Sequence, residues 1–337
     1  MSPIELRSDT FTKPTKAMLD YMFKAEVGDD VWEEDITVKA LQEKISNIFG
    51  MEAALFCPSG TMANQIAIKV HTQAGDEVIC DYTSHVYQYE GGGIAFNSSA
   101  SVKLLNGENG KLTVDLVEAA LRDDNVHFPR TSLVSVENTT NKGGGACYDL
   151  KTLQELSNLC KDKNLNFHMD GARLYNAIIK TNTNPSDYGA IFDSISVCIS
   201  KGLGAPIGSL LLGTKAFIYK AKRIRKVLGG GMRQAGYMAA ACDFALEFNV
   251  GLLKDDHRRA KEIEEILLSL DYVLEVLPVE TNIVIFSIDN PLTFVDYLKS
   301  KNILCSAIGP EQIRFVTHHQ FNDEMLIELI SALCSYS

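Results

Sequence analysis

The chain has 337 residues, of which 46% are hydrophobic, and a formal net charge of −11, values typical of a globular protein of about two domains. Phosphate backbones are bound by clustered lysines and arginines, so this acidic balance argues against nucleic acid as a partner. No segment approaches the ~18 uninterrupted apolar residues of a membrane span, and the first seven residues lack the apolar region of a signal peptide, so we expect a cytoplasmic protein without a membrane partner.

The predicted elements begin with an arm and one helix in residues 1–45. Between about residues 50 and 213, short β-rich segments alternate with helical patterns, and the predicted strands are 78–81, 132–137, 165–170, 194–200 and 207–213. Asp149 is the expected N-cap of a helix over 149–161, in which Leu153, Leu156 and Cys160 share one face. Strands that alternate with helices predict βαβ units around a largely parallel sheet.

The pattern changes after about residue 250. A charged amphipathic helix is predicted over 254–270, two strands within 273–288, a helix near 291–301, a strand over 313–318 and a closing helix. We therefore expect an α/β large domain in residues 1–250, which includes the arm, and a smaller α+β domain in residues 251–337. The eight cysteines include no C-x-x-C pair, so we expect buried thiols and no metal site.

The residues that indicate chemistry stand at predicted strand ends, where sites of open α/β sheets collect. Asp170 ends the strand 165–170, and Lys201 directly follows the strand 194–200. Pyridoxal phosphate requires a lysine amine for its aldehyde and a carboxylate beside its pyridine nitrogen. The segment 58–64, with Gly60 and Thr61, predicts a helix start whose free N–H groups bind phosphate. The order of phosphate cradle, aspartate and lysine therefore indicates a pyridoxal phosphate site.

With these motifs the sequence resembles the low-specificity L-threonine aldolases, which have the aspartate aminotransferase-like fold of pyridoxal phosphate enzymes. The resemblance covers nearly the whole chain. Its motifs are LRSDT (6–10), GDDV (28–31), PSGTMAN (58–64), SHVY (84–87), ENT (137–139), HMDGAR (168–173), SKGLGAP (200–206), GGMRQ (230–234) and RFVTH (314–318). One departure is Thr140, where many relatives have a histidine.

The resemblance implies a cofactor and the residues that bind it. Pyridoxal 5'-phosphate would form a Schiff base on Lys201, and Asp170 would pair with its pyridinium. His85 would stack on the ring, and Gly60 and Thr61 would bind the phosphate.

The resemblance also implies substrate and interface residues. Ser8, Arg173 and Arg314 would bind the substrate carboxylate, with Arg173 also close to the cofactor, and His127 would lie near the substrate hydroxyl. In the family, the positions that match Lys226 and Arg233 reach across a subunit interface toward the neighbour's cofactor phosphate. The alternative is that these residues belong to an ordinary solvated basic helix face. A homodimer with shared sites, assembled into a homotetramer, is the expected state.

The implied reaction is retro-aldol cleavage of L-threonine, and of L-allo-threonine, to glycine and acetaldehyde, a reaction of glycine biosynthesis. The base is His85, His127 or a water that they hold, and the sequence does not decide among them. The nearer alternative is another pyridoxal phosphate enzyme of this fold, such as a β-eliminating lyase, a serine hydroxymethyltransferase or an aminotransferase. The farther one is a non-catalytic regulator that binds pyridoxal phosphate, or a scaffold protein without a cofactor.

Overall fold

The computed structural model describes residues 3–336, and its main element is a seven-stranded sheet in the order β2-β8-β7-β6-β5-β3-β4. The strands are β2 (Ala53–Cys57), β3 (Glu77–Asp81), β4 (Ser101–Leu105), β5 (Thr131–Glu137), β6 (Asn166–Gly171), β7 (Ser194–Cys198) and β8 (Ser209–Gly213). All five strands predicted in this part of the chain are confirmed. β2 and β4 were not predicted.

The sheet is parallel except at one strand. The pairs β3–β4, β3–β5, β5–β6 and β6–β7 are parallel, whereas β8 is antiparallel to both β7 and β2. Because β8 lies between β7 and β2 and is antiparallel to both, β2 runs in the same direction as β7. The carboxyl ends of β2, β3, β5, β6 and β7 therefore meet at one edge, and this edge positions the site.

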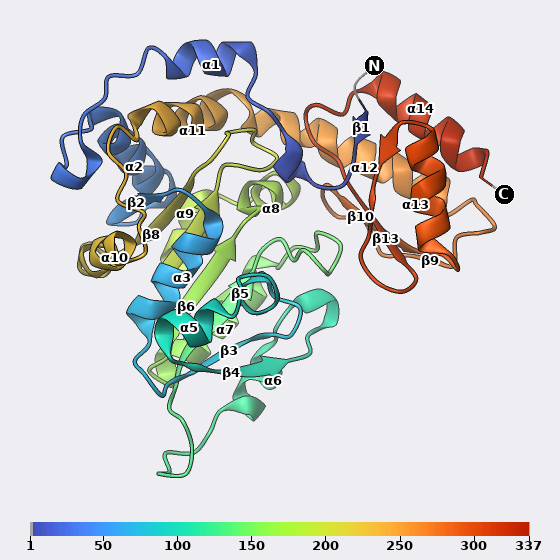
Figure 1. Ribbon diagram of the computed structural model, residues 1–337. Coiled ribbons are helices and arrows are strands. Elements are labelled where there is room, and N and C mark those ends of the chain that lie inside the picture. The colour runs from blue at the N-terminus through green and yellow to red at the C-terminus, as the bar shows by residue number, and fades with distance from the viewer. Residues whose placement is uncertain (1–2, 337) are drawn as a thin grey trace.

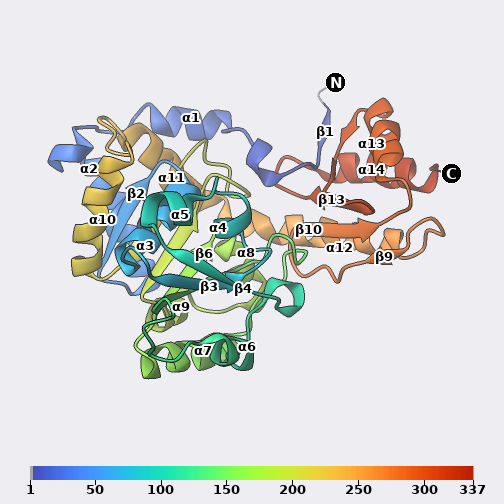
Figure 2. The same ribbon diagram turned by 60° about the horizontal axis from the view of Figure 1, so that its bottom comes forward.

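Helices cover both faces of the sheet in two layers (Figures 1 and 2). One layer holds α3 (Gly60–His71), α4 (His85–Gln88), α5 (Gly93–Ser98) and α10 (Lys215–Val227). The opposite layer holds α2 (Ile36–Phe49), α6 (Val114–Ala120), α7 (Leu150–Asp162), α8 (Leu174–Thr181) and α9 (Pro185–Ile191), with α1 (Lys16–Met22) and α11 (Gly236–Phe248) beside α2.

Local sequence explains why these helices begin where they do. Asp149 caps α7, because its side chain accepts a hydrogen bond from the Thr152 N–H, and this confirms the predicted cap. Leu153, Leu156 and Cys160 are buried on one face of α7. Between the two helical layers, apolar side chains of the strands form a core on each face of the sheet.

The C-terminal part forms a second layer structure, the orange and red lobe of Figure 1. A four-stranded antiparallel sheet has the order β12-β13-β10-β9. Its elements are β9 (Glu275–Val276), β10 (Ile283–Ser287), β12 (Ser306–Ala307) and β13 (Gln312–Val316), with helices α12 (Leu253–Leu267), α13 (Pro291–Ser300) and α14 (Asp323–Cys334). The predicted elements all form in the predicted order, whereas β12 and a further short strand, β11 (Ile303–Leu304), were not predicted.

The start of the chain belongs structurally to this lobe. β1 (Ile4–Glu5) pairs in parallel with β11 (Ile303–Leu304), and Ile4 and Leu6 are buried in the apolar core of the C-terminal part. The domain boundary at residue 250 stays a prediction. The N-terminal arm, which was assigned to the large domain, packs on the C-terminal lobe through residues 4–6. In residues 3–336 no helix is long and apolar enough to cross a bilayer.

Candidate active site

Segments that follow the carboxyl ends of five strands, together with the N-terminal arm and the C-terminal lobe, line two adjoining cavities. The inner cavity, about 190 Å³, is lined by segments that follow β2, β3, β6 and β7, and its members are Thr10, Ser59, Gly60, Thr61, Asn64, His85, Asp170, Ala172, Cys198, Ser200 and Lys201. The outer cavity, about 560 Å³, shares Thr10, His85 and Lys201 with it and adds Ser8, Tyr89, Asn141, Lys142, Arg173, Ser306, Ala307, Ile308 and Arg314. The structure thus brings most of the predicted site residues together.

Asp170 and Lys201 face the inner cavity from neighbouring strands. Asp170 lies in β6 and is 2% exposed. Its Oδ2 accepts a hydrogen bond from Asn64 Nδ2 at 2.8 Å, and its Oδ1 accepts one from the Ala172 N–H at 3.0 Å. Lys201 lies in the turn that follows β7, and its backbone carbonyl oxygen accepts a hydrogen bond from Thr12 Oγ1 at 2.9 Å. The Asp170 carboxylate, fixed by hydrogen bonds, and the Lys201 side chain therefore line the same small cavity.

The start of α3 forms the far wall of the inner cavity. Ser59 is its N-cap, and the Ser59 hydroxyl accepts from the Met62 N–H at 3.1 Å, which confirms the predicted helix start. Gly60 and Thr61 follow, and both line the cavity. The first N–H groups of this 12-residue helix lack partners within the helix, and they favour an anion such as a phosphate.

His85 lines both cavities, and Glu90 contacts its imidazole ring through Nδ1. Its Nδ1 lies 2.9 Å from Glu90 Oε1, a carboxylate that also accepts from Asn64 and Gln65. Burial lowers the pKa of His85, but the hydrogen bond to Glu90 and the charges of Asp170 and Glu90 outweigh it and raise that pKa above 6.5. Glu90 thus fixes the ring and leaves Nε2 for the cavity.

Glu137 connects two of the segments around the site. Its carboxylate oxygens accept from the His85 N–H and the Asn141 N–H, both at 2.9 Å. Burial, reinforced by the charge of Asp170, raises the pKa of Glu137 to about 7. This carboxyl group positions the His85 and Asn141 loops relative to each other.

A buried polar chain runs from Asp170 through the helix layer. Asn64 Oδ1 lies 3.2 Å from His168 Nε2, and His168 Nδ1 lies 2.8 Å from Ser194 Oγ, which in turn lies 2.8 Å from His71 Nε2. Burial lowers the pKa of His168 to about 3 and that of His71 to about 4, so both rings are neutral near pH 7. With a proton on Nε2, His168 donates to Asn64 Oδ1, and this leaves the Asn64 amide N–H directed at Asp170.

Arg173 already has a carboxylate partner within the chain. Its Nε and Nη2 donate to the two carboxylate oxygens of Asp9 at 2.8 and 2.7 Å, and the side chains are 5% and 0% exposed. Burial raises the pKa of Asp9, but the charge and hydrogen bonds of Arg173 outweigh it and lower that pKa to about 2. Arg173 lines the outer cavity, yet one edge of its guanidinium is committed to Asp9.

Arg314 differs, because within residues 3–336 it makes no ion pair. It lies on β13, where Nη1 donates to Asn141 Oδ1 at 3.0 Å and Nη2 donates to the Arg7 carbonyl at 3.1 Å. Its Nε is buried and has no hydrogen-bond partner in the described part of the chain. Burial and the charge of Arg173 lower the pKa of Arg314. A half-buried cation beside a second cation favours a bound anion, and a carboxylate matches the guanidinium geometry. Ser8 lines the same cavity.

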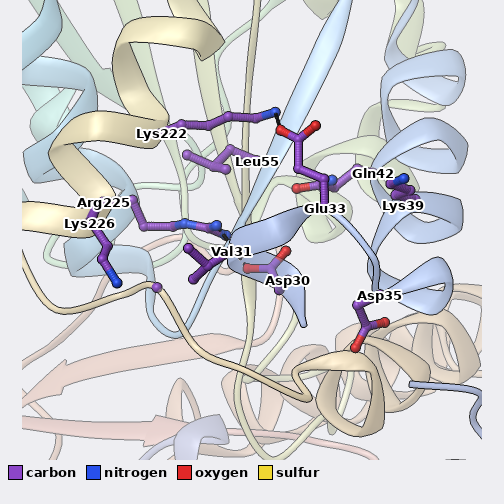
Figure 3. Close-up of a pocket in the computed structure, with 11 residues that line it drawn as sticks. Asp30, Val31, Glu33, Asp35, Lys39, Gln42, Leu55, Lys222, Arg225 and Lys226 are labelled. Carbon is purple, nitrogen blue, oxygen red and sulfur yellow. Dashed lines mark hydrogen bonds and ion pairs between the residues drawn. The ribbon is translucent and has the colours of Figure 1, made fainter. Parts of the chain in front are cut away.

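Lys226 and Arg233 lie away from both cavities. Figure 3 shows Lys226 beside the buried Arg225–Asp30 pair, at a separate cavity of about 220 Å³. Lys226 is exposed and has no ion pair in the described part of the chain, whereas Arg233 donates to Asp29 at 2.8 Å. Within a single chain, neither residue lines the cavity that holds Lys201.

His127 lies at the opposite edge of the sheet. It stands in the exposed loop between α6 and β5 that extends downward in Figure 1, and it precedes β5 rather than following it. Asp170 ends the neighbouring strand, paired with Glu137 at the end of β5. A strand of six or seven residues spans about 20 Å. The structure therefore does not bring His127 to the site of its own chain.

Sequence reasoning missed the residues that support the site. Glu90, Asn141 and Asp9 hold His85, Arg314 and Arg173 in place, and none was singled out for that role. One signal was available for Asn64, which is a polar residue on a face of α3 that also buries Ala63 and Ala67. No local pattern marks Glu90.

Comparison with known proteins agrees with this geometry. The family model described as beta-eliminating lyase matches residues 5–291. The low specificity L-threonine aldolase of Escherichia coli K12 is 39% identical over 97% of this chain and 97% of its own length, and the low-specificity L-threonine aldolase 1 of Arabidopsis thaliana is 39% identical over 95% and 92%. The chain belongs to the low-specificity L-threonine aldolase family. A solved Leishmania major threonine aldolase, 20% identical, shares the fold of this family member, with a TM-score of 0.89 over 98% of this chain and 99% of that one.

The inner cavity suits pyridoxal phosphate, the cofactor on which this family depends. Its donor set includes a lysine amine, a buried carboxylate and a helix start, which match the aldehyde, the pyridine nitrogen and the phosphate. At Gly60 the nearest atoms to an added Cβ are 3.9 Å away, so the cradle is open at the helix start. The residues present therefore fit the group.

Proposed function

We propose that this chain cleaves L-threonine and L-allo-threonine to glycine and acetaldehyde with pyridoxal phosphate. The observation that carries the proposal is one cavity system in which Lys201 and Asp170 adjoin Arg314, a half-buried cation that has no carboxylate partner among residues 3–336. The names of the curated relatives support the choice of reaction.

The chain's own residues would hold the cofactor as follows. The Lys201 amine would hold the aldehyde carbon as a Schiff base, Asp170 would accept the pyridine N–H, and the N–H groups after Ser59 would bind the phosphate. His85 would lie against the ring. When bound, pyridoxal phosphate supplies an electron sink for the pair released as the Cα–Cβ bond breaks.

Arg314 would bind and orient the amino acid. Its guanidinium is fixed by Asn141 and the Arg7 carbonyl, so the bound carboxylate takes a defined orientation, with Ser8 and the remaining edge of Arg173 beside it. This orientation sets which bond at Cα breaks, because only a bond perpendicular to the ring delivers its electrons efficiently. Arg314 is therefore the principal carboxylate ligand in this proposal.

His85 would remove the proton of the β-hydroxyl through Nε2. Its support is its position at the junction of the cavities and the Glu90 carboxylate behind Nδ1, which stabilises the imidazolium that forms. His127 lies at the other edge of the sheet, so it would act only from a second copy of the chain. His85 is the base of the same chain in this scheme.

The assembly we propose is a homodimer with shared sites, combined into a homotetramer. Lys226 and Arg233 are exposed cations outside their own chain's site. A cation near a dianionic phosphate at a helix start is favourable. Both residues would therefore contact the cofactor phosphate of the partner subunit.

The test is product analysis with the purified holoenzyme. L-Threonine should give equal amounts of glycine and acetaldehyde without folate or a keto acid. Ammonia with 2-oxobutanoate would instead indicate a β-eliminating lyase, and folate-dependent release of glycine from L-serine would indicate a serine hydroxymethyltransferase. Lys201→Ala should abolish turnover, and turnover that survives this change would contradict the assignment of Lys201.

A further inference from the structure

Four cations line the outer cavity, and the proposed cleavage of threonine does not use one of them, Lys142. Lys142 lines this cavity, and its Nζ donates to the Ile308 carbonyl at 3.0 Å. It lies 6.0 Å from the centre of the Tyr89 ring. An ammonium has three donors, and only this one hydrogen bond is formed by Lys142 among the described residues, so two N–H groups remain for another partner.

The charge around the cavity is unbalanced. Lys142, Arg173, Lys201 and Arg314 line it, whereas no aspartate or glutamate is among its lining residues in the described chain. Asp9, behind the wall, neutralises Arg173, and the α-carboxylate of the substrate would neutralise Arg314. Lys201 is taken by the cofactor. Within residues 3–336, Lys142 is left without a counter-ion, although the protein as a whole is acidic.

Lys142 also stands on the same rim as the carboxylate anchor. Asn141, the preceding residue, holds Arg314 through its Oδ1 at 3.0 Å. The bond from Lys142 to Ile308 joins this loop to the segment between β12 and β13, and Ile308 lines the cavity too. A substituent that projects from Cβ of a substrate held by Arg314 would therefore meet this rim.

The volume of the outer cavity leaves room for such a substituent. It measures about 560 Å³, and the methyl group of threonine fills only a small part of it. Water surrounds part of Lys142, which is half-buried. The outer cavity thus has space for a larger substituent, the Lys142 ammonium to bind it, and Arg314 to hold the α-carboxylate of the same substrate.

We propose that this enzyme also cleaves β-hydroxy amino acids that carry a carboxylate on Cβ, and that Lys142 binds that carboxylate. The inference rests on the proposed aldol cleavage and extends its substrate class. β-Hydroxyaspartate is the smallest such compound. Its Cα–Cβ bond breaks, the electron pair stays with Cα and is protonated to give glycine, and the β-hydroxyl loses its proton to give glyoxylate. No oxidant or further reactant is needed.

The experiment compares β-hydroxyaspartate with β-hydroxyasparagine, its neutral amide of nearly equal size. For the wild-type holoenzyme, kcat/KM should be about tenfold higher for the acid, the scale of one charge-assisted hydrogen bond at a half-exposed site. Lys142→Met should reduce this ratio to about one, and Lys142→Glu should invert it. The change should lie in KM, because the distal carboxylate does not react.

Lys111→Met is the matched control. Lys111 is also half-buried and also donates to a backbone carbonyl, that of Cys147 at 3.3 Å, but it lines neither cavity. Its variant should keep the wild-type preference for the acid. Each value is divided by the same variant's kcat/KM for L-threonine, so losses of cofactor or folded protein cancel.

A second measurement does not depend on turnover. Succinate has the same carbon chain with two carboxylates, and its calorimetric dissociation constant for the holoenzyme should rise about tenfold in Lys142→Met and stay unchanged in Lys111→Met. An equal kcat/KM for acid and amide in the wild type, or a preference that survives Lys142→Met, overturns the inference. If L-threonine itself is not cleaved, the proposed function fails instead.

Discussion

The buried pair of Asp9 and Arg173 offers a quantitative test of how the site is built. In Asp9→Asn, an amide replaces a carboxylate that is 0% exposed and that takes two short hydrogen bonds from the guanidinium. The fall in the pKa of Asp9 from 3.8 to about 2 corresponds to about 2 kcal/mol of stabilisation. Removing one partner also leaves Arg173 as a buried charge, so the total loss should be about 3–5 kcal/mol.

Thermal unfolding of the cofactor-saturated enzyme measures this loss. For 337 residues, the entropy of unfolding is about 0.7 kcal/mol/K, so Tm should fall by about 4–7 °C. The control is Asp20→Asn, which breaks the exposed i,i+4 pair with Lys16, whose side chains are 56% and 89% exposed. Such a pair contributes about 0.5 kcal/mol or less, so the control should move Tm by about 1 °C at most.

The pH dependence gives the sign of the effect. Because the folded pKa of Asp9 is depressed, its contribution is fully present above the unfolded value of 3.8 and is lost as pH falls toward 2. The difference in Tm between wild type and Asp9→Asn should therefore be constant between about pH 5 and pH 8. A fall in Tm no larger than that of Asp20→Asn would refute the reasoning.

Three further predictions concern the site itself. Asp170→Asn should retain the cofactor, seen by its visible absorbance, but lose about a hundredfold or more in kcat, because an amide does not stabilise the protonated ring nitrogen; near wild-type kcat would remove this role. Arg314→Ala should lower kcat/KM for L-threonine about a hundredfold and increase racemisation and transamination products, and an unchanged product ratio with unchanged affinity would exclude it from the site. Lys201→Ala and Arg233→Ala, unfolded together and reassembled, should regain activity if sites are shared, since one site of the mixed dimer is intact; no recovery would show that each site belongs to one chain.

Local sequence determined the positions of the cofactor residues along the chain. The apolar runs that end at Asp170 and Ser200 form β6 and β7 as predicted, and parallel neighbours bring the residues that follow them to one edge. Caps at Asp149 and Ser59 were predictable as well. These features depend on residues a few positions apart, so periodicity and turn chemistry are enough to find them.

Two strands of the large sheet were not visible in that pattern. β4 lies at the edge of the sheet, and its side chains are only partly covered, so it lacks the apolar run of a central strand. β2 is buried and as long as β3, β7 and β8, but only three residues separate it from the helix α2. In both cases the neighbouring strands, rather than the segment itself, decide that a strand forms.

Only the tertiary structure decided which predicted groups meet and in what state. Asp9 and Arg173 are 164 residues apart and Arg314 and Asn141 are 173 apart, and no local period records such pairs. The same holds for the edge of the sheet on which a residue lies: His127 and His85 are both loop histidines in sequence, but one precedes β5 and the other follows β3. Strand direction and long-range burial set the charge, partner and location of each group, because they depend on the packing of the whole chain.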